Sequence, residues 1–110
     1  MAKKINILGT DYEIIESTDK EMPALKCADG RCSFYAKKIY IETEPFQNAD
    51  FVEPGDSAEH IKFVKRHEVI HAFNNESGKH TTSANEEWMV NYIATIFPKM
   101  LAVFKEVDAL

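Results

Sequence analysis

The sequence predicts one α+β domain over residues 1–110, in which a small antiparallel sheet of hairpins packs against two helices. Strand-forming residues separated by turn signals occupy the first part of the chain, and helical periodicity begins only after residue 55. Strands that precede helices in this way are typical of the α+β class. The length of 110 residues and the hydrophobic content of 45% suit a single core.

The first strands are expected to form a hairpin. Residues 5–8 and 12–15 are rich in strand formers and lie on either side of Gly9, Thr10 and Asp11. A short connection that contains glycine is typical of a β-hairpin. We therefore expect the turn at Gly9 to Asp11.

A second hairpin is expected over residues 33–43, with its turn at Ala36, Lys37 and Lys38. Before it, residues 19–22 could begin a short helix that Pro23 would interrupt, and residues 28–30 carry a turn signal. Since each hairpin is antiparallel, the sheet that they build is expected to be antiparallel.

The first helix has a marked start and end. Asp56 as N-cap and Glu59 three residues later form a capping box, directly after a turn at Pro54 and Gly55. Ser77 and Gly78 supply a stop signal. The predicted helix therefore runs from residue 56 to about residue 77.

The last helix is expected to begin at Ser83, with Glu86 at the third helical position of another capping box. Pro98 must kink this helix, because proline lacks the N–H that would bond to the carbonyl of Ala94. The apolar side chains of the helix are expected to fill the core of so small a domain. The predicted face comprises Met89, Ile93, Ile96, Met100 and Phe104, and a wider stripe adds Trp88, Tyr92 and Phe97.

Charge and composition exclude several classes of protein. The formal net charge is −5, from 18 acidic and 13 basic residues, which argues against non-specific binding of nucleic acid or anionic membranes. No apolar run reaches the length of a membrane span, and the N-terminus lacks a signal-peptide core, so we expect a cytoplasmic protein. Cys27 and Cys32 are then expected to be free thiols, and the basic residues Lys62, Lys65 and Arg66 to lie on a solvated face.

The strongest functional signal is the run from His67 to His71. Two histidines at positions i and i+4 of a helix lie one turn apart on the same face, so both imidazoles can reach one metal ion. Glu68 between them can take a proton from a metal-bound water, as in zinc-assisted hydrolysis. The pattern therefore predicts a catalytic zinc site with Glu68 as general base.

A catalytic zinc usually has three protein ligands. We favour Glu87 as the third, because Glu86 is engaged in the predicted capping box with Ser83. Asn91, one turn after Glu87, is a candidate partner for a ligand histidine. His60 lies about 10 Å along the helix from His67 and is too far away. The alternatives that stay open are Glu86, His80, Asn74 and the two cysteines.

Three segments of the chain resemble minimal gluzincin-type zinc metallopeptidases, close to small phage and prophage proteins and more distantly the ImmA/IrrE and SprT-like groups. The segments are HEVIHAF at 67–73, NEEWMVN at 85–91 and FYAKKIYI at 34–41. The resemblance implies a Zn²⁺ site of His67, His71 and a downstream glutamate. It also implies that the strand around Ile39 and Ile41 runs along the cleft, where an extended peptide substrate adds as a further strand. A phage-encoded chain would work in the bacterial host cytosol.

The function predicted from the sequence is therefore hydrolysis of peptide bonds by a zinc metalloendopeptidase. Tyr92 and His80 are candidates for stabilising the oxyanion, although the sequence gives them no geometric support. The alternative is a non-catalytic binding module of the phage type with a structural or vestigial zinc site. A fourth protein ligand would favour that alternative, since structural zinc sites are closed.

Overall fold

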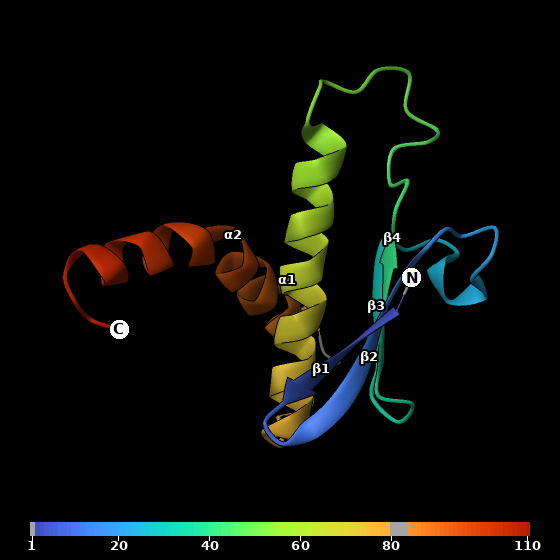
Figure 1. The fold of residues 1–110 in the computed structure, drawn as a ribbon. Coiled ribbons are helices and arrows are strands. Elements are labelled where there is room, and N and C mark those ends of the chain that lie inside the picture. Colours follow the sequence, from blue (N-terminus) through green and yellow to red (C-terminus); the bar gives the residue numbers. More distant parts are fainter. Residues whose placement is uncertain (1, 80–83) are drawn as a thin grey trace.

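The computed structural model describes residues 2–79 and 84–110 of the chain. Four strands form one sheet, and two long helices follow them, so the predicted α+β class is confirmed (Figure 1). The elements are β1 (Ala2–Ile7), β2 (Thr10–Ser17), the short 3₁₀ helix η1 (Pro23–Leu25), β3 (Gly30–Ser33), β4 (Lys38–Glu42), α1 (Asp56–Glu76) and α2 (Ala84–Glu106).

The sheet is mixed, so the prediction of an antiparallel sheet is wrong. The order of strands is β1-β2-β4-β3, and both hairpins, β1–β2 and β3–β4, are antiparallel as expected. The second hairpin starts earlier than predicted, at Gly30, and its connection is residues 34–37, since Lys38 already belongs to β4. The two hairpins join through β2 and β4, however, and these strands run parallel, from Glu13 opposite Lys38 to Ser17 opposite Glu42. The parallel pair arises because the segment between β2 and β3 takes β3 to the outer edge, so that β4 enters beside β2.

The first hairpin turns earlier than expected. Ile7 pairs with Thr10, so the connection consists of Leu8 and Gly9, both with positive φ (50° and 94°). Positive φ at both central residues is typical of the tight turns that match the twist of a hairpin, and glycine adopts it without strain. The side chain of Asn6 supports the turn by accepting a hydrogen bond from the N–H of Gly9 (3.0 Å).

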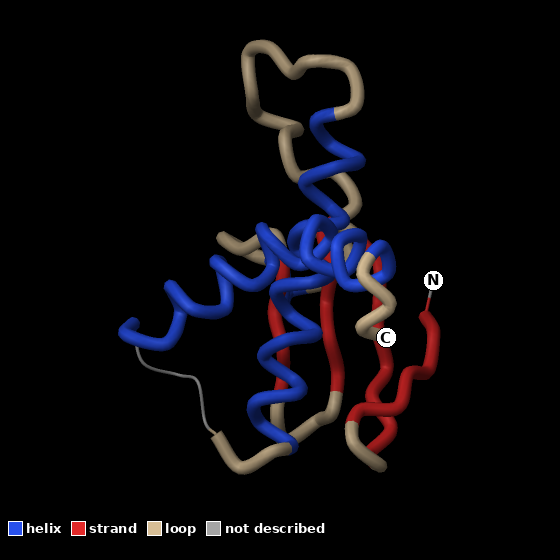
Figure 2. The backbone as a smooth tube through the Cα atoms, turned by 90° about the vertical axis from the view of Figure 1, so that its left-hand side faces the viewer, coloured by secondary structure: helices blue, strands red, loops and turns tan. Residues whose placement is uncertain are grey.

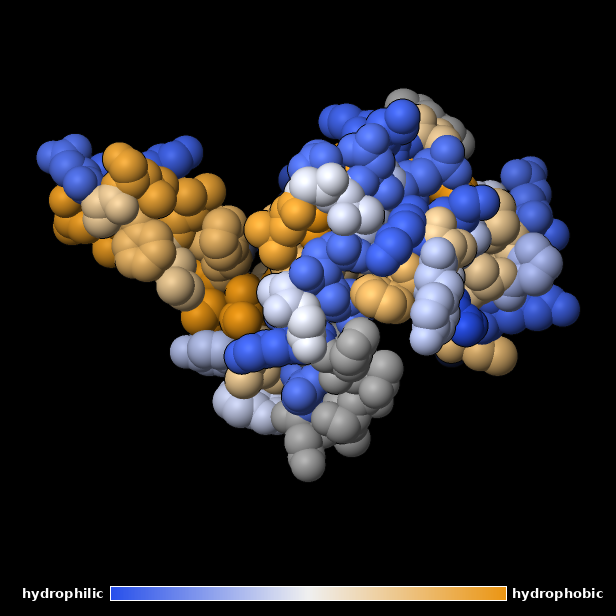
Figure 3. Space-filling model, turned by 90° about the horizontal axis from the view of Figure 1, so that it is seen from below, coloured by the Kyte–Doolittle hydropathy of each residue, from blue (hydrophilic) through white to orange (hydrophobic). Residues whose placement is uncertain are grey.

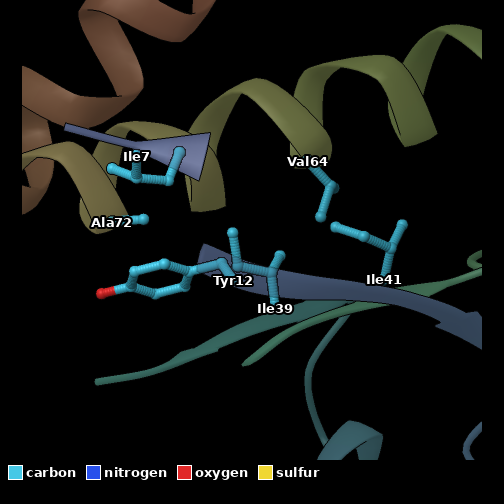
Figure 4. Close-up of a cluster of buried hydrophobic side chains, with 6 residues drawn as sticks. All are labelled: Ile7, Tyr12, Ile39, Ile41, Val64 and Ala72. Carbon is cyan, nitrogen blue, oxygen red and sulfur yellow. The ribbon is translucent and has the colours of Figure 1, made fainter. Parts of the chain in front are cut away.

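Helix α1 lies on one face of the sheet and buries one stripe of residues against it (Figures 1 and 2). The buried positions are Val64, Glu68 and Ala72, which follow each other at intervals of four residues. Val64 and Ala72 pack against apolar side chains of the sheet, as Figure 4 shows. The cluster comprises Ile7, Tyr12, Ile39, Ile41, Val64 and Ala72.

The start of α1 differs from the prediction, and its end agrees. The N-cap is Gly55 rather than Asp56, and no side-chain cap forms, because Asp56 is already inside the helix. At the C-terminus, Gly78 adopts a φ of 91°, its N–H bonds to the carbonyl of Asn75, and the N–H of Lys79 bonds to the carbonyl of Asn74. This pair of bonds is a Schellman motif, which explains the stop at Ser77 and Gly78.

Helix α2 packs against the side of α1 that faces away from the sheet, so α1 is the middle layer (Figure 1). Its buried residues are Val90 and Ala94, both fully inaccessible to solvent. The predicted apolar face was therefore only partly correct: Ile93 and Ile96 are half-buried, but Met89, Met100 and Phe104 are exposed, and so are Trp88, Tyr92 and Phe97. The predicted N-cap Ser83 lies outside the described residues. Neither described helix contains a stretch long and apolar enough to cross a membrane.

Pro98 lies inside α2, which changes direction along its length (Figure 1). Proline cannot donate to the carbonyl of Ala94, four residues earlier. Arg66 of α1 supplies the missing donor, because its Nε donates a hydrogen bond to the carbonyl oxygen of Ala94 at 2.6 Å. The expectation that Arg66 lies on a solvated face was thus wrong, and the side chain joins the two helices.

Removal of Arg66 is expected to destabilise the chain in a way that depends on Pro98. Arg66→Ala leaves the Ala94 carbonyl without a donor and should cost about 1.5–3 kcal/mol. In a Pro98→Ala background the restored N–H of residue 98 can serve that carbonyl, so the same change should cost less. Urea denaturation of the four proteins measures the difference, with Lys62→Ala on the exposed face of α1 as a control. Equal costs in the two backgrounds would contradict this account.

A charged cluster ties the C-terminal end of α1 to the sheet. Glu76 Oε2 accepts a hydrogen bond from the Tyr12 hydroxyl (2.6 Å) and pairs with Lys37 Nζ (2.7 Å). The hydrogen bonds from Lys37 and then Tyr12 lower the pKa of Glu76 from 4.5 to about 2. A lowered pKa stabilises the fold fully above pH 4.5, and that stabilisation is lost as the pH falls toward 2.

We expect Glu76→Gln to lower the melting temperature by a few degrees at pH 7, because the ion pair with Lys37 is lost. The deficit should shrink as the pH falls from 4.5 toward 2, where the carboxylate of the unmodified chain becomes protonated. Thermal unfolding monitored by circular dichroism at several pH values tests this. A deficit that stays constant over this range would mean that the charge of Glu76 is not responsible.

Candidate metal centre

Three side chains from the two long helices converge at one point. His67 and His71 lie one turn apart on α1, and Glu87 lies in the first turn of α2. Glu87 Oε1 is 2.5 Å from His67 Nε2, Glu87 Oε2 is 3.1 Å from His71 Nε2, and the two Nε2 atoms are 3.1 Å apart. The histidine side chains are mostly buried, at 14% and 13% exposure. The packing of α2 on α1 therefore brings Glu87 to His71, although the two residues are 16 positions apart in the sequence.

The donor set and its spacing fit a zinc ion. Two imidazole nitrogens and a carboxylate oxygen are common zinc ligands, and bonds of about 2.0–2.1 Å in a tetrahedron place neighbouring donor atoms roughly 3.3 Å apart. Within the group of His67, His71 and Glu87, the separations of 3.1 and 3.4 Å lie close to that value, whereas the 2.5 Å between His67 Nε2 and Glu87 Oε1 is shorter and is the length of a direct hydrogen bond. One donor atom from each residue lies within 4.8 Å of the others, so the three residues could hold a metal ion.

The other candidate ligands lie elsewhere. Among the described residues Glu86, His60 and both cysteines are outside this group, Asn74 does not line the cleft beside it, and His80 lies outside the described residues. His60 pairs with Asp29 instead, at 2.8 Å. Glu86 has a buried Oε2 without a hydrogen-bond partner among the described residues. The choice of Glu87 over Glu86 as a metal ligand is still a prediction, but only Glu87 reaches the two histidines.

The burial of His67 favours the form of its ring that binds a metal. Burial lowers the pKa of His67, against the opposing charge of Glu87, and a neutral imidazole is the form that binds metal. Asn91 also acts on this ring and raises its pKa. The buried Nδ1 of His67 nevertheless has no hydrogen-bond partner among the described residues. Asn91 thus lies close to a histidine nitrogen that ligand histidines normally use for an orienting hydrogen bond.

Glu68 differs from the three candidate ligands in its surroundings. It lies on the buried stripe of α1, is 7% exposed, and lines the same cleft as His67, His71 and Glu87. Burial, and then the negative charge of Glu87, raises the pKa of Glu68 from 4.5 to about 7 in the metal-free chain. A carboxyl group with these properties can exchange a proton near neutral pH, as a general base must.

The cleft beside the centre has a volume of about 790 Å³. Strand β3 contributes Gly30, Arg31 and Cys32, the turn after it contributes Phe34 and Tyr35, and α1 adds Asn75 one turn beyond His71. Tyr35 is 95% exposed at the rim. Tyr92, one of the two proposed oxyanion residues, does not line this cleft.

The edge of the sheet beside the cleft is β3 and not β4. Ile39 and Ile41 belong to β4, which is paired on both sides, and both side chains are fully buried. A substrate cannot add as a strand at these residues, so this expectation was wrong. The free edge next to His67 belongs to β3.

Cys32 lines the cleft, but its thiol is expected to be unreactive. Burial, and then the charge of Glu68, raises the pKa of its thiol to about 12, so the thiolate is scarce near neutral pH. Cys27 is exposed, and both cysteines are free thiols as expected.

Gly30 lies beside the centre, against Val64 and Glu68. From the sequence it was interpreted only as part of a turn, so this role was missed. A Cβ at this residue would lie 2.5 Å from Val64 Cγ1 and 2.9 Å from both Cγ and Oε2 of Glu68. Real Cβ atoms are not found so close to other heavy atoms. Glycine at position 30 therefore allows β3 to approach α1 directly beside Glu68.

Gly30→Ala is expected to destabilise the fold by about 1–3 kcal/mol, because the added methyl overpacks the contact between β3 and α1. Val64→Ala removes the atom that lies nearest to the new methyl. The double variant should therefore lose less stability than the sum of the two single variants, as measured by urea denaturation. Additive losses would show that the clash with Val64 is not the cause.

Comparisons with known proteins return no match for this chain. No family model, no curated protein and no solved structure matches it. The resemblance to gluzincin-type metallopeptidases therefore stays a prediction from the sequence motifs, and the centre is interpreted from its own geometry.

Proposed function

We propose that the chain is a zinc-dependent metallopeptidase. The observation that supports this best is the convergence of His67, His71 and Glu87 at a cleft that Glu68 also lines. Three candidate ligands among the described residues leave room for a water or substrate ligand, which is the arrangement of catalytic rather than structural zinc sites. The alternative is a binding module with a closed zinc site, which needs a fourth protein ligand. The group formed by the described residues His67, His71 and Glu87 does not contain one.

Each residue of the centre has a separate role in the proposed hydrolysis. Zinc, when bound, would supply an acidic water and polarise the scissile carbonyl. Glu68 is the group that accepts the proton of the attacking water and returns it to the leaving amine. His67, His71 and Glu87 would hold the metal, and Asn91, which acts on the ring of His67, is the residue that would orient it.

The substrate class that fits the cleft is an extended peptide. Strand β3 (Gly30–Ser33) has one edge paired with β4 and the other edge open beside the centre. An added strand gains main-chain hydrogen bonds there, and the cleft next to it receives side chains. Phe34 and Tyr35 supply apolar and aromatic surface for one of these side chains.

The test is metal-dependent cleavage of a complex peptide mixture. The zinc-loaded chain is incubated with peptides from a digested proteome, and new termini are identified by mass spectrometry. We expect cleavage that stops after chelation and returns when zinc is restored. A chain that binds one zinc and leaves every peptide intact would overturn the proposal and favour the binding module. Cleavage that resists chelation would reveal a contaminating protease.

A further inference from the structure

The second half of α2 is an apolar arm that nothing in the described chain covers. The C-terminal part of α2 leaves α1 and projects away from the body of the domain (Figure 1). In residues 97–110, which we call the arm, only Leu101 is partly buried, and all other residues are exposed. Figure 3 shows hydrophobic side chains gathered along this projection.

The apolar side chains of the arm follow a heptad pattern. Phe97, Met100, Phe104 and Val107 lie at intervals of three and four residues, which places them in one stripe. Leu101 and Val103 widen this stripe on its two sides. The same spacing, extended back along the helix, reaches Val90 and Ile93 in the part that packs on α1. The exposed stripe thus continues an established helix–helix interface.

The charges of the arm lie away from the stripe and cancel. Lys99, Lys105 and Glu106 occupy the opposite face, and Asp108 follows the last turn. Two basic and two acidic residues make the arm neutral, although the whole chain carries −5. A two-fold interface places a surface against its own copy, so a neutral apolar face pairs with itself without repulsion. A lipid-binding helix would instead be rich in basic residues.

The area of the stripe suits a dimer. Its large apolar side chains are between 37% and 62% exposed, from Met100 to Val107. With about 150–200 Å² for each whole side chain, they leave roughly 400 Å² of apolar surface uncovered. Homodimer interfaces are about 65% apolar, so this corresponds to about 600 Å² in each copy and about 1,200 Å² in total, the lower end of the range for stable interfaces.

We infer that the arm pairs with the arm of a second copy of this chain, which makes the protein a two-fold homodimer. The inference is independent of the metal centre and of the proposed function, since Phe97 and the residues beyond it take no part in either.

The test compares two charge insertions on the same exposed helix by analytical ultracentrifugation of the full chain at about 1–100 µM. Phe104→Glu places a charge in the stripe, and Ala102→Glu places the same charge on the opposite face. We expect a dimer for the unmodified chain and for Ala102→Glu, and dimerisation weakened about 30-fold or more by Phe104→Glu. An unchanged circular dichroism spectrum and a cooperative thermal transition show that each variant is folded.

Other outcomes would overturn the inference. A monomeric unmodified chain over the whole concentration range would exclude the dimer. A dimer that Phe104→Glu leaves intact would place the interface elsewhere. Open-ended oligomers would exclude two-fold pairing, and a monomer that floats with vesicles of neutral or anionic lipid would assign the arm to membranes.

Discussion

A Glu87→Ala variant is expected to lose zinc, whereas Glu86→Ala, changed one position earlier, keeps it. Of these two glutamates, only Glu87 reaches both histidines, through Oε1 to His67 and Oε2 to His71. Mutation of a residue that only hydrogen-bonds to a metal ligand can weaken metal affinity by roughly 100-fold. Loss of one of three direct ligands should therefore weaken zinc affinity by at least that factor. The metal content of each purified chain is measured by mass spectrometry, and the affinity by competition with a chelating dye.

The Glu86→Ala variant is the matched control for this result. Its carboxylate lies in the same helical turn and contributes the same charge to the N-terminal end of α2, so general effects on the helix are shared. Equal loss in both variants would mean that helix stability, and not ligation, is responsible. Retention in both would leave Cys32 or His80 as the third ligand, and Cys32→Ala and His80→Ala then separate these two.

Glu68→Gln is expected to abolish hydrolysis while zinc stays bound. The amide has the shape of the carboxyl group and cannot accept the proton, so the rate should fall by about 10²–10⁴-fold. The side chain is not among the three candidate ligands, which is why the metal should remain. Cleavage of the best peptide from the mixture and zinc content are measured on the same preparation.

The stability of Glu68→Gln distinguishes a chemical from a structural role. Glu68 is buried against β3, so removal of its charge should leave the thermal stability unchanged or raise it. An inactive variant that is also less stable would indicate a role in packing. Glu86→Gln serves as the control, and it should keep both activity and zinc. Full activity of Glu68→Gln would end the general-base role.

Local features of this chain were predictable because they depend on neighbours in the sequence. The spacing of His67 and His71 places both rings on one face of any helix, so their proximity follows from helical geometry alone. The stop at Gly78 depends equally on local conformation. The N-cap of α1 was predicted one residue too late, at Asp56, since Gly55 caps the helix instead.

The centre itself required the fold. Glu87 was preferred by elimination, on a capping box whose Ser83 lies outside the described residues, and its meeting with His67 depends on how α2 crosses α1. That crossing rests on the fully buried Ala94, which permits close approach, and on Arg66, which serves the carbonyl left free by Pro98. The contact between Gly30 and Glu68 joins residues that are far apart in the sequence, so it left no local signal.

The sequence by itself thus determined the α+β class, the hairpins, and the His67–Glu68–His71 face of α1, because each is a short-range property of the chain. Tertiary structure alone decided that β2 and β4 run parallel, that β3 is the free edge beside the cleft, and that Glu87 completes the group. It also decided that the apolar stripe of α2 is largely exposed. Periodicity shows that a helix face is apolar, but only the packing of the whole chain determines what covers it.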